Sequence, residues 1–295
     1  GAYSGFVNYF DIPIWASDCT TIKPLDEKRV LTKYLYYILK HIQEDIYNLQ
    51  TGMGQPHVYA KDLEKIEIPL PPIEEQKKIV EELDRYQRII DGARMVVDNW
   101  EPEIKIDEEW KKVKLEEVCY INRKTLKIKN EEKYHYIDIS SINNENGNFN
   151  TGQAIEGKAL PSRARRTVQV GDVLLSTVRP YLKAYALIKE LPDNPVASTG
   201  FAVLTPREEI LSGWLYFILF TDFLQKQMES RMCKGAYPSI NTKDVSELVI
   251  PLPNIEIQSN IINNMKKQKE ALLANEYLAE ETERKIQDRV KMLFE

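Results

Sequence analysis

Apolar residues recur at regular intervals in two long stretches of the chain. Within residues 73–101 they alternate by four and three positions, at Ile79, Leu83, Tyr86, Ile90, Ala93 and Val97. Within residues 254–295 one returns every seven positions, at Met265, Leu272, Ala279, Ile286 and Leu293. Heptad spacing predicts two long helices that pair as an antiparallel coiled coil. The alternative is two amphipathic helices, each lying on its own domain.

Each predicted helix follows the same proline-rich phrase. IPLPPIEEQKKIV spans residues 68–80, and IPLPNIEIQSNII spans residues 250–262. Prolines hold the chain extended, whereas glutamates in a first helical turn are favoured by the helix dipole. Each phrase therefore predicts the end of a strand, a stiff elbow and the start of a helix.

The likeness between the two halves continues upstream of both phrases, and we expect Thr32 and Ser212 to be N-caps of matching helices. The offset between matching positions stays between 180 and 182, so we infer an internal duplication. Residues 110–195 have no counterpart in the first copy, so the chain is expected to begin within a repeat. The matching pairs are LTKYLYYILK (31–40) with LSGWLYFILF (211–220), and WASDCTTIKP (15–24) with VASTGFAVLTP (196–206).

Composition narrows the class of protein. With 295 residues and 43% hydrophobic content, the chain can bury the cores of two domains, and no apolar run is long enough to span a membrane. The three cysteines and three histidines are scattered, so we expect no metal site and a reducing, cytoplasmic location. Residues 109–253 carry 20 Lys+Arg and 17 Asp+Glu, against 20 and 28 elsewhere, which permits a nucleic-acid partner for that region.

One candidate DNA-contacting segment is VGDVLLSTVRPYLKAYALI (170–188), which predicts a β-hairpin. Arg179, Tyr181 and Lys183 would alternate along its turn and the strand after it. Arginine can bond the O6 and N7 atoms of guanine together, while lysine and tyrosine can anchor phosphates. The alternative role for Arg179 is an ion pair with a carboxylate such as Asp172.

Further candidates lie in a cluster of arginines and in a pair of duplicated loops. The loop CKGAYPSIN (233–241) corresponds to GMGQPHVYA (52–60), and the proline is retained while its neighbours change. Two readers of different half-sites would look like this, and so would two loops that drifted freely. The candidates are Arg163, Arg165, Arg166, Lys234, Tyr237, Ser239 and Asn241 in the second copy, and Gln55, His57 and Tyr59 in the first.

In combination these motifs resemble the specificity (S) subunits of type I restriction–modification systems. The resemblance rests on both elbow phrases, on GDVLLSTVRPYLKA (171–184), on KGAYPSINTKDVSELVIPLP (234–253) and on EEWKKVKLEEVC (108–119). It implies α/β (α+β) target-recognition modules joined by long helices that form the antiparallel coiled coil. The implied domains are the C-terminal half of a first recognition domain (1–72), a first conserved spacer helix (73–101), a second recognition domain (102–253) and a second spacer helix (254–295).

The resemblance also implies a function. The chain would be a non-catalytic reader of a bipartite site in double-stranded DNA, and the heptad helices would set the gap and dock two modification (methyltransferase) subunits. S-adenosylmethionine would be bound by those subunits and not by this chain. A restriction/translocase subunit would complete the complex.

Two alternatives stay open. IIDGARMVVDNWEPEIKIDEEW (89–110) resembles linkers of fused polypeptides, so the chain could be the specificity tail of a single-chain restriction–methylation enzyme. A coiled-coil adaptor that does not bind DNA is the alternative from another class. The sequence has no Gly-rich cofactor loop and no (N/D)PP(Y/F) methyltransferase motif. Asp138, Glu156 and Lys158 match the bare spacing of a nuclease motif, which arises easily in a chain that is 29% charged.

Overall fold

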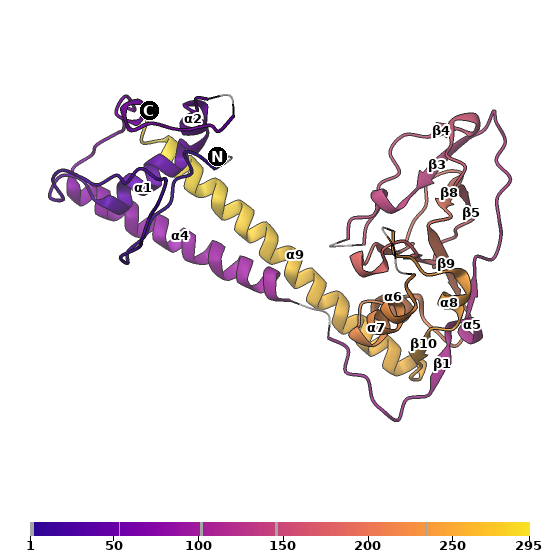
Figure 1. Cartoon of the computed structure of the whole chain (residues 1–295). Coiled ribbons are helices and arrows are strands. Elements are labelled where there is room, and N and C mark those ends of the chain that lie inside the picture. The colour runs from indigo at the N-terminus through magenta and orange to yellow at the C-terminus, as the bar shows by residue number, and fades with distance from the viewer. Residues whose placement is uncertain (1–2, 53, 101–102, 145–146, 234, 236) are drawn as a thin grey trace. The chain divides into compact units, whose positions relative to one another are not determined.

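The computed structural model describes residues 3–52, 54–100, 103–144, 147–233, 235 and 237–295. These divide into two units (Figure 1), one made of Gly1–Trp100 with Glu270–Glu295 and the other of Glu101–Lys269. The long helix α9 (Ile255–Lys291) contributes its first turns to the second unit and the rest to the first unit.

Two four-stranded sheets form the frame of the second unit (Figure 1). The first sheet is antiparallel, and the second contains one parallel pair, β3 with β8. A third pairing, β1 (Lys112–Lys114) with β10 (Val249–Pro251), joins the beginning of the unit to its end. In order, the first sheet holds β2 (Cys119–Ile121), β9 (Phe201–Pro206), β6 (Val173–Ser176) and β7 (Tyr185–Leu187), and the second holds β4 (Ile155–Glu156), β3 (Lys133–Ile137), β8 (Pro195–Ser198) and β5 (Ala164–Arg166).

Strand β6 lies at the centre of this unit and is buried on both faces. Val173 and Leu175 pack with the helices, and Leu174 packs in a second core drawn from both sheets. This double burial explains the uninterrupted apolar run in the sequence. The helices are α5 (Leu115–Val118), α6 (Ser212–Ile218), α7 (Asp222–Arg231), α8 (Thr242–Ser246) and the start of α9, with 3-10 turns η1 (Ile139–Ser141), η2 (Gly157–Ala159) and η3 (Pro180–Leu182).

The first unit is helical. Among its described residues, backbone pairing between strands is limited to an isolated bridge of Thr51 with His57. Its core includes Tyr34, Ile38 and Leu83, all fully buried. The helices are α1 (Thr32–His41), α2 (Gln43–Asn48), α3 (Ala60–Leu63), α4 (Ile73–Asn99) and residues 270–291 of α9.

Helix α4 and the last turns of α9 run in opposite directions within the first unit. Arg289 Nε donates to Glu82 in the first half of α4 at 2.9 Å, whereas Arg94 near the end of α4 pairs with Glu283. Both long helices were predicted correctly. The predicted heptad seam, however, includes a residue at the start of α9 that does not face α4. Met265 packs in the core of the second unit, because the start of α9 lies on its own domain there. A supercoiled seam along both helices stays a prediction.

The duplication is visible bond by bond at the two elbows. Buried Gln76 donates to the carbonyls of Pro71 and Arg29, both at 2.8 Å, and accepts from Leu31 N–H at 3.0 Å. Its counterpart, also fully buried, makes the same three bonds. Those bonds are Gln258 Nε2 to Pro253 O at 2.8 Å and to Glu209 O at 3.1 Å, and Leu211 N–H to Gln258 Oε1 at 2.8 Å.

A second pair of buried side chains repeats this pattern. Tyr34 donates to Pro69 O at 2.9 Å, and Trp214 donates to Pro251 O at 3.1 Å. The predicted caps, by contrast, were wrong. Thr32 and Ser212 are the first helical residues, and neither helix start has a side-chain cap. The elbow glutamines hold the helix starts instead, through the N–H groups of the residue before each helix.

Candidate nucleic-acid interface

Two loops that carry predicted DNA contacts meet on the second unit. Arg179 N–H donates to Pro238 O at 2.7 Å, and Ile240 N–H donates to Thr177 O at 2.9 Å. Between these bonds, Val178 and Ser239 form an isolated antiparallel bridge. Residues 177–183 and 237–241 therefore form one surface, which we call the recognition surface. The sequence predicted each loop separately but not their contact.

The hairpin predicted over 170–188 is confirmed, because β6 pairs with β7. Its turn is different from the prediction. Arg179, Tyr181 and Lys183 do not alternate along a strand, since Pro180 starts the 3-10 turn η3 and β7 begins only at Tyr185. Arg179 (φ 48°) and Lys183 (φ 54°) flank η3 in the left-handed region, which side chains larger than glycine adopt at a cost.

Buried side chains hold this turn from below. Tyr185 Oη donates to Pro180 O at 2.8 Å, and Gln225 Nε2 donates to Tyr185 Oη at 3.1 Å and to Leu219 O at 2.7 Å. Burial raises the pKa of Tyr185, so the phenol stays a donor. Sequence reasoning missed Tyr185 and Gln225. No local sequence pattern around either residue predicts this role.

Arg179 lies over the ring of Tyr237, with its guanidinium carbon 5.2 Å from the ring centroid. Tyr237 itself is 74% exposed. Asp172, the ion-pair partner that the sequence suggested for Arg179, makes hydrogen bonds to other residues. It accepts from Thr205 Oγ1 at 2.7 Å and from Gln169 N–H at 2.9 Å, and burial raises its pKa. The arrangement joins a cation to an exposed aromatic ring, one from each loop.

The arginine cluster lies on and beside β5. Arg163 and Arg165 are exposed on either side of buried Ala164, as alternation along a strand requires. Arg165 Nε donates to Ser162 O at 2.8 Å. Arg166 is half-buried, and burial lowers the pKa of its guanidinium.

The other predicted residues of the 233–241 loop differ in their roles. Asn241 caps α8: its Oδ1 accepts from Asp244 N–H at 3.0 Å, and the Asp244 carboxylate accepts from Asn241 N–H at 2.8 Å. The side-chain oxygen of Asn241 is thus engaged in the fold. Ser239 is half-buried, and Lys234 lies outside the described residues.

The counterpart loop of the first unit exposes all three predicted side chains, Gln55, His57 and Tyr59. The rings of His57 and Tyr59 lie 6.2 Å apart, and Lys61 Nζ lies 5.5 Å from the Tyr59 centroid. In each unit an exposed tyrosine of the duplicated loop thus lies next to a cation from outside that loop.

The residues that match a nuclease spacing take part in local structure. Asp138 caps η1, accepting from Ser141 N–H at 3.0 Å, and Lys158 pairs with Glu156 at 2.7 Å. Within the described residues no cluster of His, Cys, Asp and Glu side chains is suited to a metal ion. In the same residues no helix is long and apolar enough to cross a membrane.

The helix residues predicted for subunit docking are mostly turned inward within the first unit. Ile79, Leu83, Ile90 and Ala93 on α4 and Ala279 on α9 are buried, whereas Tyr86, Val97, Leu272, Ile286 and Leu293 are half-buried. Buried side chains are not accessible to a partner, so any docking surface must use others. Exposed apolar residues outside the seam, which sequence reasoning missed, are Ile89, Met95 and Val96 on α4 and Leu273, Tyr277 and Leu278 on α9.

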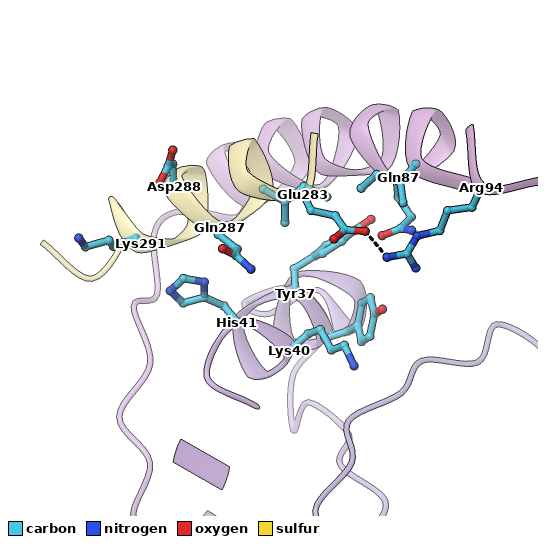
Figure 2. A pocket seen from close by; sticks show the side chains of 12 residues that line it. Tyr37, Lys40, His41, Gln87, Arg94, Glu283, Gln287, Asp288 and Lys291 are labelled. Atoms are coloured by element: carbon cyan, nitrogen blue, oxygen red, sulfur yellow. Dashed lines mark hydrogen bonds and ion pairs between the residues drawn. The ribbon is translucent and has the colours of Figure 1, made fainter. Parts of the chain in front are cut away.

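Between α1, α4 and the last turns of α9 lies a pocket of about 630 Å³ (Figure 2). Charged, amide, aromatic and aliphatic side chains line it, and Arg94 and Glu283 pair across one side of it (Figure 2). Burial lowers the pKa of Lys40 and of His41, which both line it. No described feature of this pocket points to a particular ligand.

Comparisons with known proteins agree on one family. The model of the "Type I restriction modification DNA specificity domain" matches residues 1–94 and 107–280. The MjaVIII type I restriction enzyme specificity subunit of Methanocaldococcus jannaschii is 24% identical over 84% of this chain and 66% of its own length. The HindI specificity subunit of Haemophilus influenzae is 32% identical over 36% of this chain and 24% of its own length.

Solved structures give the same result. The HsdS subunit from Thermoanaerobacter tengcongensis matches with a TM-score of 0.53 and 31% identity, over 63% of this chain and 48% of that one. The S subunit from M. genitalium, at 19% identity, shares the fold over 91% of this chain and 74% of that one, with a TM-score of 0.54. The chain spans 66% or less of the curated relatives reported above and about half of the HsdS subunit.

Proposed function

Because this chain belongs to the family of type I restriction–modification DNA specificity domains, whose members are the non-catalytic specificity components of these enzymes, we propose that it reads a bipartite DNA site and docks the methyltransferase subunits that modify it. The observation that carries this proposal is the recognition surface, where two loops separated in sequence present a cation and an exposed aromatic ring together.

The chemistry of this surface suits a duplex groove. Arg179 can bond the O6 and N7 atoms of a guanine while the ring of Tyr237 orients its guanidinium, and the exposed ring of Tyr181 can contact sugar and phosphate. Arg165 on β5 and Arg163 just before it add positive charge to the same unit. The duplicated loop of the first unit, with Tyr59 and His57, would read the other half of the site.

The long helices α4 and α9 offer a surface for protein partners. We assign the docking of methyltransferase subunits to the exposed apolar residues of α4 and α9, because an apolar face in water gains free energy when a partner covers it. Ile89 and Val96 lie along one side of α4, since they are seven residues, or about two turns, apart. S-adenosylmethionine would be bound by those subunits. A restriction subunit would join the same complex.

Salt-dependent DNA binding tests the proposal. The purified chain is titrated against a pool of duplexes with randomised positions at several salt concentrations, and bound duplexes are sequenced. We expect enrichment of two short blocks separated by a fixed gap, and an affinity that falls with salt in a log–log plot. An adaptor without DNA binding would enrich nothing at low salt.

The two units would recognise DNA in the same way if the chain were the specificity tail of a fused restriction–methylation enzyme. In that case the docking helices would contact a methyltransferase region of the same polypeptide. Methyl transfer to DNA by this chain with S-adenosylmethionine and no partner would contradict both versions of the proposal.

A further inference from the structure

We propose that residues 179–183 are a rigid wedge, in which Leu182 enters the base stack of the bound duplex while Lys183 contacts the flanking backbone. This inference rests on the proposed function. It adds a way of recognising DNA by its deformability to the recognition of base edges.

The first argument is the stiffness of the turn. Leu182 N–H donates to Arg179 O and Lys183 N–H donates to Pro180 O, both at 2.9 Å, and Tyr185 N–H donates to Lys183 O at 2.7 Å. The bond from Tyr185 Oη to Pro180 O and the bond from Arg179 N–H to Pro238 O fix the turn to the core and to the second loop. Two residues in left-handed conformation persist only where the surroundings determine them.

The second argument is the side chain at the tip. Pro180 is buried under the turn, whereas Leu182 is 48% exposed, immediately before Lys183. Tyr181 is also exposed, but its hydroxyl can face water or a phosphate. Leucine has no such group, and the stiff turn presents this aliphatic side chain next to Lys183 and three residues after Arg179. DNA-bending proteins insert Leu, Ile, Met or Phe between base steps in this way.

The third argument is the consequence for the partner. An enzyme that modifies a base must take it out of the stack, and unstacking is easier where the duplex is already distorted. A wedge on the reader would favour flexible pyrimidine–purine steps and lower the free energy that the partner spends on extruding the base.

The probe is the duplex that the wild-type chain enriches from the randomised pool, with 2-aminopurine replacing each adenine in turn. Its fluorescence rises when the base loses stacking. We expect a rise at one step for the wild type, loss of that rise and about tenfold weaker binding for Leu182→Ala, and retention of both for Leu182→Met. Val170→Ala, at a position of the same unit that is 60% exposed, is the matched control and should leave both signals unchanged.

Melting temperatures separate a wedge from a structural role. Leu182→Ala should melt like the wild type, because the side chain is half exposed. A wild type that binds its duplex with no 2-aminopurine signal would overturn the wedge alone, as would a variant that loses stability together with binding. A wild type that enriches no duplex would overturn the proposed function, and the wedge with it.

Discussion

At the scale of single residues, Arg179 can contact either a base or a phosphate, and the two contacts predict different effects of its substitution. If it reads a guanine, Arg179→Ala should weaken binding to the enriched duplex by roughly 1–3 kcal/mol and change binding to unrelated DNA little. If it contacts only phosphate, all duplexes should lose similarly and the salt slope should fall by about one. Titrations of both DNAs at two salt concentrations decide between these outcomes.

The control for this prediction is the stability of the variant. The ring contact with Tyr237 is worth about 0.5–1 kcal/mol at an exposed site, and the melting temperature of the variant measures the loss of this contact together with that of any other contact of the side chain. A stable Arg179→Ala variant that binds every DNA like the wild type would remove Arg179 from the recognition surface. A variant that unfolds early would give the side chain a structural role.

Tyr185→Phe tests the support beneath the turn. The change removes the donor to Pro180 O and the acceptor for Gln225, so we expect a loss of roughly 1–3 kcal/mol in the free energy of unfolding, measured by urea titration. Tyr216→Phe is the matched control, because Tyr216 also packs on Phe220 and no hydrogen bond among the described residues joins it to residues 177–183. Equal losses in both variants would contradict the role given to the Tyr185 hydroxyl.

Residue roles were predicted from the sequence only where chemistry alone decides them. Arg179 and Tyr237 are cation and ring in any fold, and the structure brings them together. Asn241 has the same chemistry in a helix cap as in a DNA contact, and only the position of α8 shows that it caps. Tyr185 and Gln225 depend on a hydrogen bond between residues 40 apart, which no local pattern contains.

At the scale of elements, the elbow is the part that the duplication repeats most faithfully. Gln76 and Gln258 each make three hydrogen bonds from a fully buried side chain. Gln258→Ala should therefore cost about 2–4 kcal/mol, because it leaves an N–H and two carbonyls in need of partners. Gln76→Ala should cost a similar amount, and differential scanning calorimetry of both variants measures the two losses.

Surface glutamines give the contrast for this pair. Gln87 is partly exposed on α4, and its one side-chain hydrogen bond among the described residues goes to Asp91 of the same helix, so Gln87→Ala should change stability by less than about 0.5 kcal/mol. If Gln76→Ala and Gln258→Ala lost as little stability as Gln87→Ala, the buried glutamines would not stabilise the elbow. The sequence predicted the elbow from its prolines and from the glutamates of the helical turn that follows. It could not predict that the glutamines are buried, because amides are usually found at the surface.

The exposed apolar surfaces of α4 and α9 allow the proposed docking of methyltransferase subunits to be tested. Val96→Asp and Leu273→Asp place a charge on exposed apolar positions of the first unit, which should leave folding intact and weaken binding of the methyltransferase subunits at least about tenfold. Co-purification and calorimetric titration with the partner subunit measure this. Lys77→Asp, an exposed polar position on α4, is the control. Unchanged partner binding in both apolar variants would move the docking surface elsewhere.

At the scale of the whole molecule, each of the two units has its own copy of the elbow, and the described part of the second unit adds two β-sheets. The helices and the duplication could be predicted because they leave periodic patterns in the sequence. The two sheets of the second unit could not, since β3 with β8 and β6 with β9 pair residues that are far apart in sequence. The positive excess of residues 109–253 agrees with the recognition surface lying on that unit, while the net charge of the whole chain is −5.

Bipartite reading makes a prediction that only the whole chain can satisfy. Tyr237→Ala and Tyr59→Ala each remove one exposed ring from the duplicated loop, one in the second unit and one in the first. If each unit reads one half-site, selection from the randomised pool should show Tyr237→Ala relaxing the preference in one block of positions and Tyr59→Ala relaxing the other. Each relaxation should amount to roughly 1–3 kcal/mol at one or two positions, the usual cost of a mismatched base pair. Both variants relaxing the same block, or Tyr59→Ala leaving the selected sequences unchanged, would mean that the second unit alone reads the DNA.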